Sequence, residues 1–197
     1  MELKSVRSAV ALTLLILGST VQAHTGHGTS GILQGLEHPF GLDHLLAMVA
    51  VGIWSVSALP TKKVWWGPGV FMITLLISAF AGTKGIAVSN LENLISLSVI
   101  IFGVMLVLTR FRMSPKLGLI LIAMGASMHG LAHGAEGPES GFIAYAIGFL
   151  LTTGFLHFSG VAAGLAAKRY KPAKETATTS TVGLLLSAVG AYMYSQL

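Results

Sequence analysis

Hydrophobic residues in this chain gather in long continuous runs, whereas soluble helices and strands show short periodic patterns of apolar and polar positions. A helix needs about 20 mainly apolar residues to cross a bilayer. Six runs of roughly this kind follow one another along the chain, and four of the six prolines fall in the connections between them. They occupy residues 39–59, 67–88, 91–109, 117–135, 141–167 and 181–194. The pattern predicts an all-α polytopic membrane protein with six transmembrane helices.

The first 23 residues have the organisation of a secretory signal peptide. Lys4 and Arg7 precede a short apolar stretch at residues 9–17, and small residues end the segment at Ala23. We therefore expect a cleaved signal at 1–23 and a single transmembrane domain at 24–197, with an uncleaved anchor helix as the alternative. Cleavage after Ala23 would place His24 at the mature terminus, where its α-amine and imidazole could chelate a metal. The alternative is a terminal tail without a function.

Basic residues are distributed unevenly among the connections. Nine lie after the first, third and fifth apolar segments, whereas the loops on the opposite side contain only Lys84. Since basic loops face the cytoplasm, both mature termini are predicted to lie on the outer side. The net charge of +5 is therefore explained by membrane topology, and it does not indicate a nucleic-acid partner.

The composition supports a membrane protein and restricts the chemistry. Only 10% of the residues are charged and 53% are hydrophobic, whereas a soluble domain has about 25% charged residues. Cysteine is absent, which excludes disulfides, thiolate ligands and cysteine nucleophiles. Any metal must be held by nitrogen and oxygen atoms, a donor set that suits Ni, Co, Zn, Cu(II) or Fe and disfavours Cu(I).

Two clusters of ionisable residues lie in or beside the apolar segments. His38, Asp43 and His44 stand at the start of the first segment. His129 and His133 are four residues apart in the fourth segment, and Glu136 follows three residues later. This spacing places all three on one helix face, and two histidines at i and i+4 can hold one metal. Ionisable residues are costly inside a membrane, so both clusters indicate a functional site.

Helix geometry predicts that the two clusters face each other. At about 1.5 Å per residue, His44 and His129 each lie roughly 10 Å from the outer end of their segments. The six residues could then surround one divalent ion at this depth. They are His38, Asp43, His44, His129, His133 and Glu136.

His157 and Glu92 are further candidate ligands. His157 lies roughly 24 Å from the start of the fifth segment at the helical rise, which suits a second binding station toward the cytoplasm. The alternatives are a supporting partner of the outer site or a hydrogen-bonded packing residue. Glu92 is either a ligand at the mouth or an ordinary interfacial charge.

The segment His38-Pro39-Phe40-Gly41-Leu42-Asp43-His44 resembles the signature of the HupE/UreJ family of bacterial nickel/cobalt permeases. The resemblance extends to the signal peptide that ends before a histidine, to the His129–Glu136 segment and to Phe155-Leu156-His157. It implies a multi-pass protein of the bacterial inner membrane that takes up Ni²⁺, with Co²⁺ as the alternative cargo. It also implies a link to hydrogenase or urease maturation. The identity of the metal follows from the resemblance alone.

Two other functions use the same residue types. A zinc-dependent intramembrane hydrolase could hold Zn with His129, His133, His157 and Asp43 and activate water. A haem could be held between His44 and His129. Transport is favoured because the outer loops carry Glu92, Glu136 and Glu139, which would concentrate cations. We therefore expect a transporter with no prosthetic group, whose partners are the metal ion and the lipid bilayer.

Overall fold

The computed structural model describes residues 31–170 and 174–197. Within these ranges the chain forms seven α-helices and no strand. The α-helices are α2 (Gly31–Glu37), α3 (Leu42–Ala58), α4 (Trp66–Gly82), α5 (Leu91–Leu108), α6 (Pro115–Glu136), α7 (Phe142–Tyr170) and α8 (Glu175–Ser195). Short 3-10 turns adjoin three of them: η1 (His38–Phe40), η2 (Thr61–Lys63) and η3 (Thr109–Phe111). The predicted signal peptide and His24 lie outside the described residues.

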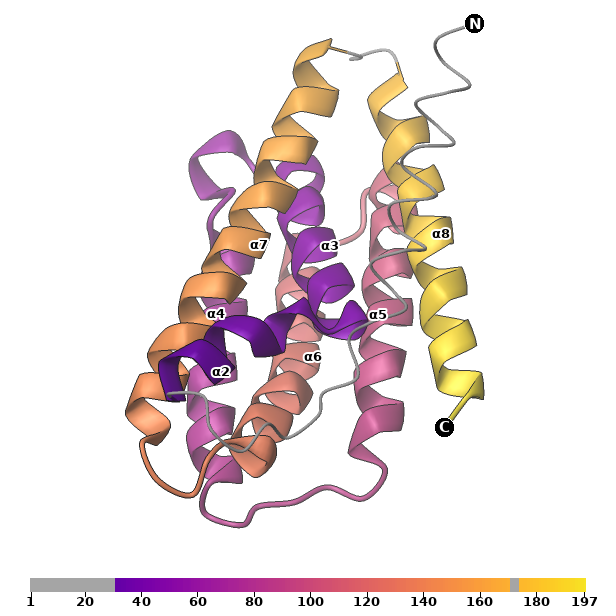
Figure 1. Ribbon diagram of the computed structural model, residues 1–197. Helices are drawn as coiled ribbons and strands as arrows, with labels where there is room; N and C mark the ends of the chain where they lie inside the picture. The colour runs from indigo at the N-terminus through magenta and orange to yellow at the C-terminus, as the bar shows by residue number, and fades with distance from the viewer. Residues whose placement is uncertain (1–30, 171–173) are drawn as a thin grey trace, which may run out of the picture.

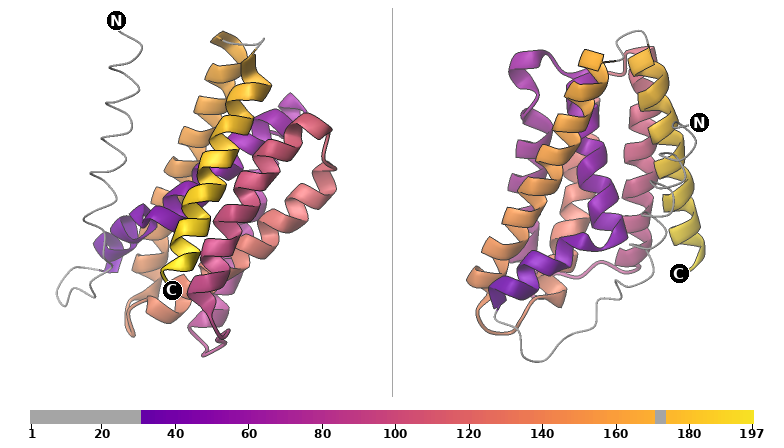
Figure 2. Two further views of the ribbon diagram at one scale, coloured as in Figure 1. Left: turned by 90° about the vertical axis from the view of Figure 1, so that its right-hand side faces the viewer. Right: turned by 45° about the horizontal axis from the view of Figure 1, so that its top comes forward.

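Helices α3 to α8 form an elongated bundle, and α2 crosses its side (Figures 1 and 2). By length and composition, four described segments could each cross a membrane: Thr61–Gly82, Leu91–Phe111, Pro115–Glu136 and Phe142–Tyr170. The pair Gly31–Phe40 and Leu42–Ala58, bent by 71°, is a fifth candidate. The chain is thus an all-helical, multi-pass membrane protein, and the sixth span at α8 stays a prediction.

The first apolar segment is not the single helix at 39–59 that the sequence predicts. Pro39 has no N–H to donate, and the Gly41 backbone is extended with φ −50° and ψ 139°. The helical hydrogen bonding therefore stops at this point, and α3 begins only at Leu42. Upstream of the break, α2 is a helix that the sequence did not predict. The hydroxyl of Thr152 in α7 donates to the carbonyl of Leu36 at 2.8 Å and helps to fix the end of α2.

The bounds of two other helices also differ from the predicted segments. Helix α4 ends at Gly82 instead of residue 88, because the following turn contains Gly85 at φ 81°. Helix α8 starts at Glu175 instead of residue 181. In both cases apolar content predicted a segment of the chain but not the residue at which the helix begins or ends.

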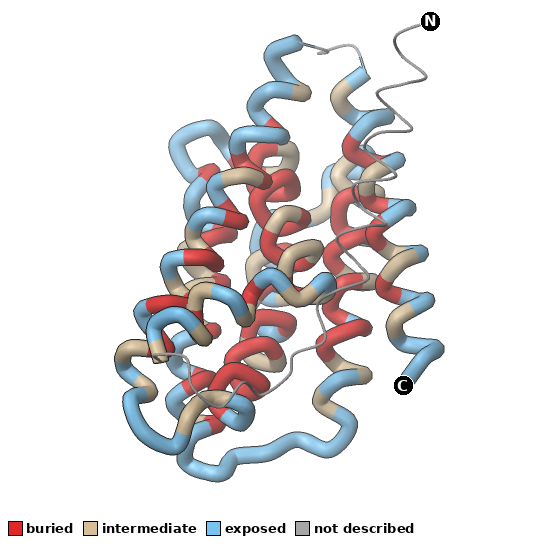
Figure 3. The backbone as a smooth tube through the Cα atoms, viewed as in Figure 1, coloured by how far each residue is buried: buried red, intermediate tan, exposed pale blue. Residues whose placement is uncertain are grey.

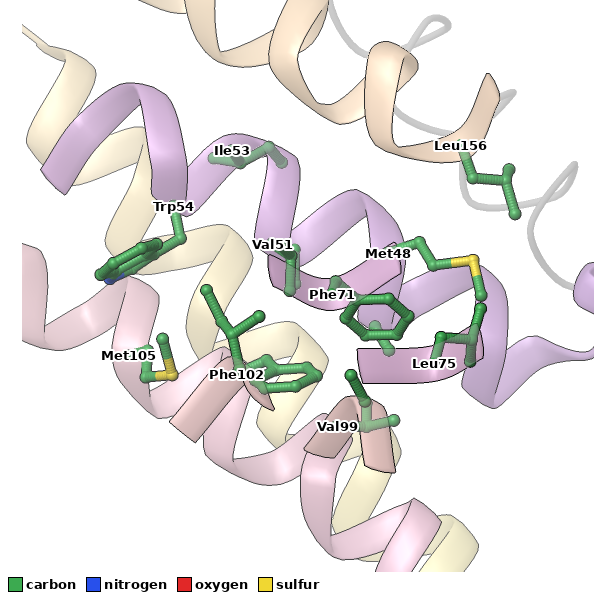
Figure 4. Packing of buried hydrophobic residues seen from close by; sticks show 14 of the residues in the cluster. Met48, Val51, Ile53, Trp54, Phe71, Leu75, Val99, Phe102, Met105 and Leu156 are labelled. Atoms are coloured by element: carbon green, nitrogen blue, oxygen red, sulfur yellow. The ribbon is translucent and has the colours of Figure 1, made fainter. Parts of the chain in front are cut away.

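Apolar side chains pack inside the bundle and also cover its outer surface. The inward faces of the helices are buried (Figure 3), and residues such as Phe71, Phe102 and Met48 fill the space between α3, α4 and α5 (Figure 4). On the outside of α4, Ile77 is 67% exposed and Phe80 is 60% exposed. Large apolar side chains exposed on a helical bundle are typical of contact with lipid.

Close contact between α4 and α6 depends on glycine. A β-carbon at Gly134 of α6 would collide with the carbonyl oxygen of Ala79 in α4. The absence of a side chain lets the two backbones touch, as small residues do in membrane helix pairs. This contact fixes the end of α6 that carries His133.

Charged connections gather at the two ends of the bundle. The connections α3–α4 and α5–α6, the end of α7 and the start of α8 share one end, and the connections α4–α5 and α6–α7 share the other (Figure 1). Described basic residues such as Lys62, Arg110 and Lys168 therefore lie opposite Glu136 and Glu139. The side of the membrane that each end faces stays a prediction.

Candidate metal site

Three histidines from different parts of the chain converge inside the bundle. His38 comes from η1, His44 from the first turn of α3 and His133 from the last turn of α6. One ring nitrogen of each lies within 4.8 Å of the others. Their ring centroids are 4.4 Å apart for His38–His133, 5.0 Å for His44–His133 and 5.3 Å for His38–His44. We call these three residues the histidine cluster.

A fourth imidazole adjoins the histidine cluster. His129 lies one helical turn from His133 on α6, and its ring centroid is 4.5 Å from that of His44. His129 and His133 are fully buried, and His44 is only 5% exposed. The cluster that contains His44 and the cluster that contains His129 and His133 therefore face each other inside the protein, as the sequence predicts.

The break at Gly41 decides how the motifs meet. The sequence placed His44 two turns inside a continuous helix, but His44 lies in the first turn of α3. Helix α3 begins partway along the bundle, while α6 continues past that level (Figure 1). Helix α2 and η1 lead the chain to this point, and they bring His38 onto the same group of imidazoles.

Asp43 holds His44 in place. Its Oδ1 lies 2.9 Å from His44 Nδ1 and also accepts the backbone N–H of His44 at 2.8 Å. With Nδ1 bonded to the carboxylate, Nε2 of His44 is buried and has no hydrogen-bond partner within residues 31–170 and 174–197. The carboxylate therefore orients the imidazole and leaves its other nitrogen free to bind an ion.

The same arrangement recurs at the histidines of α6. His133 Nδ1 lies 3.2 Å from the Tyr145 hydroxyl, and its Nε2 has no partner. His129 Nε2 lies 2.9 Å from the Ser98 hydroxyl, and its Nδ1 has no partner. A buried polar atom without a partner is costly, whereas a metal-binding histidine bonds an orienting group through its second nitrogen. The donor set of the site therefore fits a bound cation.

We expect Gly41→Ala to weaken metal binding by about 10- to 100-fold, the usual effect of losing a group that orients a ligand. A β-carbon at Gly41 would lie 2.9 Å from Asp43 Oδ1 and would push the carboxylate away from His44. Calorimetric titration of the purified protein with Ni²⁺ measures the effect. Gly69→Ala is the matched control, because a β-carbon at Gly69 meets nothing within 4 Å. Equal affinities for the two variants would contradict this role of Gly41.

His157 lies apart from the histidine cluster. Its Nδ1 donates to the Thr153 carbonyl at 2.8 Å, and its Nε2 is buried without a partner. The ring centroid of Phe71 lies 4.8 Å from that of His157 and 5.8 Å from that of His129. In the described part of the chain, no ring contact joins His157 to another imidazole. His157 therefore does not join the histidine cluster and His129; a second station and a hydrogen-bonded packing residue both stay predictions.

The two glutamates differ in their relation to the site. Glu136 Oε2 lies 3.7 Å from His38 Nε2, and the Glu136 side chain is 43% exposed. Glu92 lies exposed in the first turn of α5, and within residues 31–170 and 174–197 no ion pair joins it to the cluster. Glu136 therefore lies at the edge of the site, whereas Glu92 makes no direct contact with it.

Sequence reasoning missed several residues that shape the site, Phe149 stacked on His133 among them. Tyr145, Ser98 and Phe71 all lie within apolar segments and contact the histidines. The hydroxyl groups of Tyr145 and Ser98 are the signal that could have revealed them, because buried polar groups need partners. Phe71 carries no such signal, since an aromatic residue in an apolar segment is ordinary.

Comparison with known proteins agrees with the resemblance in the histidine motif. The family model described as HupE / UreJ protein matches residues 12–193. The chain belongs to the HupE/UreJ family. Protein HupE of Rhizobium leguminosarum bv. viciae is 37% identical over 193 residues, which cover 97% of this chain and 99% of that relative. No solved structure matches the chain. The family prediction made from the sequence is therefore confirmed.

Proposed function

We propose that this HupE/UreJ family member carries a divalent transition-metal ion into the cytoplasm, with Ni²⁺ as the main cargo and Co²⁺ as the alternative. The observation that supports this most is the group of buried imidazoles with unpartnered ring nitrogens. His44, His129 and His133 each keep one such nitrogen inside the bundle. A transported cation would satisfy these atoms, and its departure would leave them ready for the next ion.

The ligand chemistry suits transient binding of a borderline metal ion. Imidazole nitrogens bind Ni, Co, Cu and Zn, and affinity alone does not select among them. The resemblance to nickel/cobalt permeases is therefore our reason for placing Ni²⁺ first. Sites on a transport path must bind well enough to admit the ion and weakly enough to release it. Protonation of an imidazole removes its ability to ligate, which offers one means of release.

We propose a path that runs from Glu136 at the edge, through the histidine cluster and His129, to His157. Glu136 is partly exposed and close to His38, so it can receive a hydrated cation. Phe71 contacts both His129 and His157, and the ion would pass this ring between the two stations. In this proposal Asp43 orients His44, and Glu92 and His24 raise the concentration of cations at the outer mouth.

The transport direction follows from a proposed topology. We place residues 1–23 in a cleaved signal peptide and 24–197 in one transmembrane domain with six spans, α8 included. Both mature termini then lie on the periplasmic side of the bacterial inner membrane. The support is the distribution of charge, since basic residues gather at the end of the bundle that lies away from Glu136. The imported nickel would supply hydrogenase or urease maturation.

Uptake of radioactive nickel by proteoliposomes that contain the purified protein tests the function. We expect Ni²⁺ to accumulate inside these vesicles faster than inside protein-free vesicles, and unlabelled Co²⁺ to compete. His38→Ala is expected to remove most of the difference, because His38 supplies one of the three clustered nitrogens. Equal uptake by vesicles with and without the protein would contradict the proposal.

Lys62→Ala combined with Lys63→Ala is expected to leave metal affinity unchanged. Both lysines lie in η2 at the end of the bundle opposite Glu136 (Figure 1), so they cannot contact the histidine cluster. The Ni²⁺ dissociation constant of the purified double variant measures this. A large loss of affinity would mean that the basic end takes part in binding, and the proposed topology would be wrong.

A further inference from the structure

Ser98 of α5 is a buried serine that contacts an imidazole of the proposed path but has no role in that path so far. Its side chain is only 3% exposed. Its hydroxyl oxygen lies 2.9 Å from His129 Nε2 and donates to the carbonyl oxygen of Ile95 at 2.7 Å. One hydroxyl group therefore bonds both its own helix and an imidazole of α6.

The tautomer of His129 depends on which atom donates the hydrogen in each of these two bonds. A serine hydroxyl has a single hydrogen, and a carbonyl oxygen can only accept. When Ser98 donates its hydrogen to Ile95, its oxygen accepts from His129, and Nε2 carries the imidazole hydrogen. Nδ1 then keeps its lone pair, and this atom is buried without any partner.

The opposite tautomer would be costly at this position. It would place a hydrogen on Nδ1, which is buried and has no acceptor among the described residues, and an unsatisfied buried donor is unfavourable. The Ser98 bond and the empty surroundings of Nδ1 therefore favour the same proton arrangement. Nδ1 is the one ring nitrogen of His129 that remains able to bind a cation.

His129 thus differs from the other two buried histidines of the outer group. His44 and His133 use Nδ1 for Asp43 and Tyr145, and their free atom is Nε2. Nδ1 is closer to the backbone than Nε2, so an ion bound to His129 through Nδ1 lies closer to α6. The ring centroid of His129 lies 4.5 Å from that of His44, which puts His129 beside the histidine cluster.

We propose that Ser98 is a positioning residue that holds His129 in the tautomer that binds the cargo ion through Nδ1. The inference rests on the proposed function only in taking the bound ion to be the cargo. It assigns Ser98 to the metal site and gives His129, beside the histidine cluster, Nδ1 as its metal-binding atom.

Nuclear magnetic resonance of the full-length protein in detergent tests the assignment directly. The protein would carry isotope-labelled histidine and would be saturated with Zn²⁺, a diamagnetic substitute for Ni²⁺. Long-range correlation of ring hydrogens with ring nitrogens separates a metal-bound nitrogen from a protonated one. We expect metal on Nδ1 and hydrogen on Nε2 of His129, whose signals are identified by their loss in His129→Gln. Metal on Nε2 would overturn the inference.

Variants of Ser98 provide the second measurement. Ser98→Ala is expected to weaken Zn²⁺ and Ni²⁺ binding by about 10- to 100-fold, and Ser98→Thr, which keeps the hydroxyl, is expected to restore it. Ser55→Ala is the matched control, because Ser55 is fully buried and donates only to the Val51 carbonyl. Unchanged affinity in Ser98→Ala, or equal losses in Ser98→Ala and Ser55→Ala, would overturn the role of Ser98.

The two proposals fail in different ways. Binding of Zn²⁺ through Nδ1 without nickel uptake by proteoliposomes would contradict transport and support the role of Ser98. Uptake that is the same for Ser98→Ala and the unmodified protein would support transport and contradict the role of Ser98.

Discussion

Replacement of His133 by alanine is expected to reduce nickel uptake by more than about 100-fold, because even the loss of an orienting group beside a ligand costs about 10- to 100-fold. His133 contributes a buried nitrogen to the histidine cluster and contacts both His38 and His44. His44→Ala is expected to have an effect of similar size for the same reason. Uptake of radioactive nickel, normalised to the amount of protein in the membrane, measures both losses.

The double variant makes this prediction specific to one shared site. Residues that bind the same ion act together, so their effects do not add. We therefore expect His44→Ala combined with His133→Ala to be little worse than either single variant. His157→Ala is a control for affinity only: His157 lies beyond Phe71, so its loss is expected to leave the Ni²⁺ affinity of the histidine cluster intact while slowing uptake along the proposed path. Normal uptake by either single variant, with the protein inserted, would contradict a shared site.

Gly134→Val is expected to produce the largest loss of stability. A β-carbon at this position would collide with the Ala79 carbonyl, and Gly82 and Thr83 lie just beyond it. Because backbone atoms cannot turn away as a side chain can, α4 and α6 would have to separate. Overpacking usually costs about 1–3 kcal/mol, and a clash between backbones is expected to exceed that range. The yield of monodisperse protein and its thermal unfolding temperature measure the effect.

Gly69→Val in α4 is the control for this substitution. It adds the same side chain to a helix of the same pair, at a position where a β-carbon would meet nothing within 4 Å. We expect Gly69→Val to keep nearly the unfolding temperature of the unmodified protein. A Gly134→Val protein that unfolds at the temperature of this control would show that α4 and α6 do not depend on backbone contact.

The sequence was sufficient to predict an all-helical fold and to identify the histidines that the described structure brings together. Long apolar runs account for most of the helices, since a helix that contacts lipid needs apolar side chains on every exposed face. The i, i+4 spacing of His129 and His133 placed both on one face of α6. These inferences succeeded because they depend on local spacing within one helix.

The bend between α2 and α3 depends on tertiary contacts that local spacing does not contain. Pro39 and Gly41 allow the chain to leave the helical path, but they do not determine where it goes. The direction is set by α7, where Thr152 bonds the carbonyl of Leu36. A continuous helix was therefore the natural sequence prediction, and it was wrong.

The hydroxyl partners of the two α6 histidines come from other helices. Ser98 precedes His129 by 31 residues, and it reaches His129 only because α5 and α6 pack together. Tyr145 belongs to the helix after His133 and meets it across the α6–α7 turn. Sequence spacing identified candidate ligands, whereas the choice of the nitrogen each ligand presents depends on these tertiary contacts.

The most direct test of the account is a crystal structure of the protein loaded with Ni²⁺, measured at a wavelength where nickel scatters anomalously. We expect one strong nickel peak at about 2 Å, an ordinary metal–imidazole distance, from ring nitrogens of His38, His44 and His133. Nickel bound elsewhere while these three imidazoles remain free of metal would contradict the central claim.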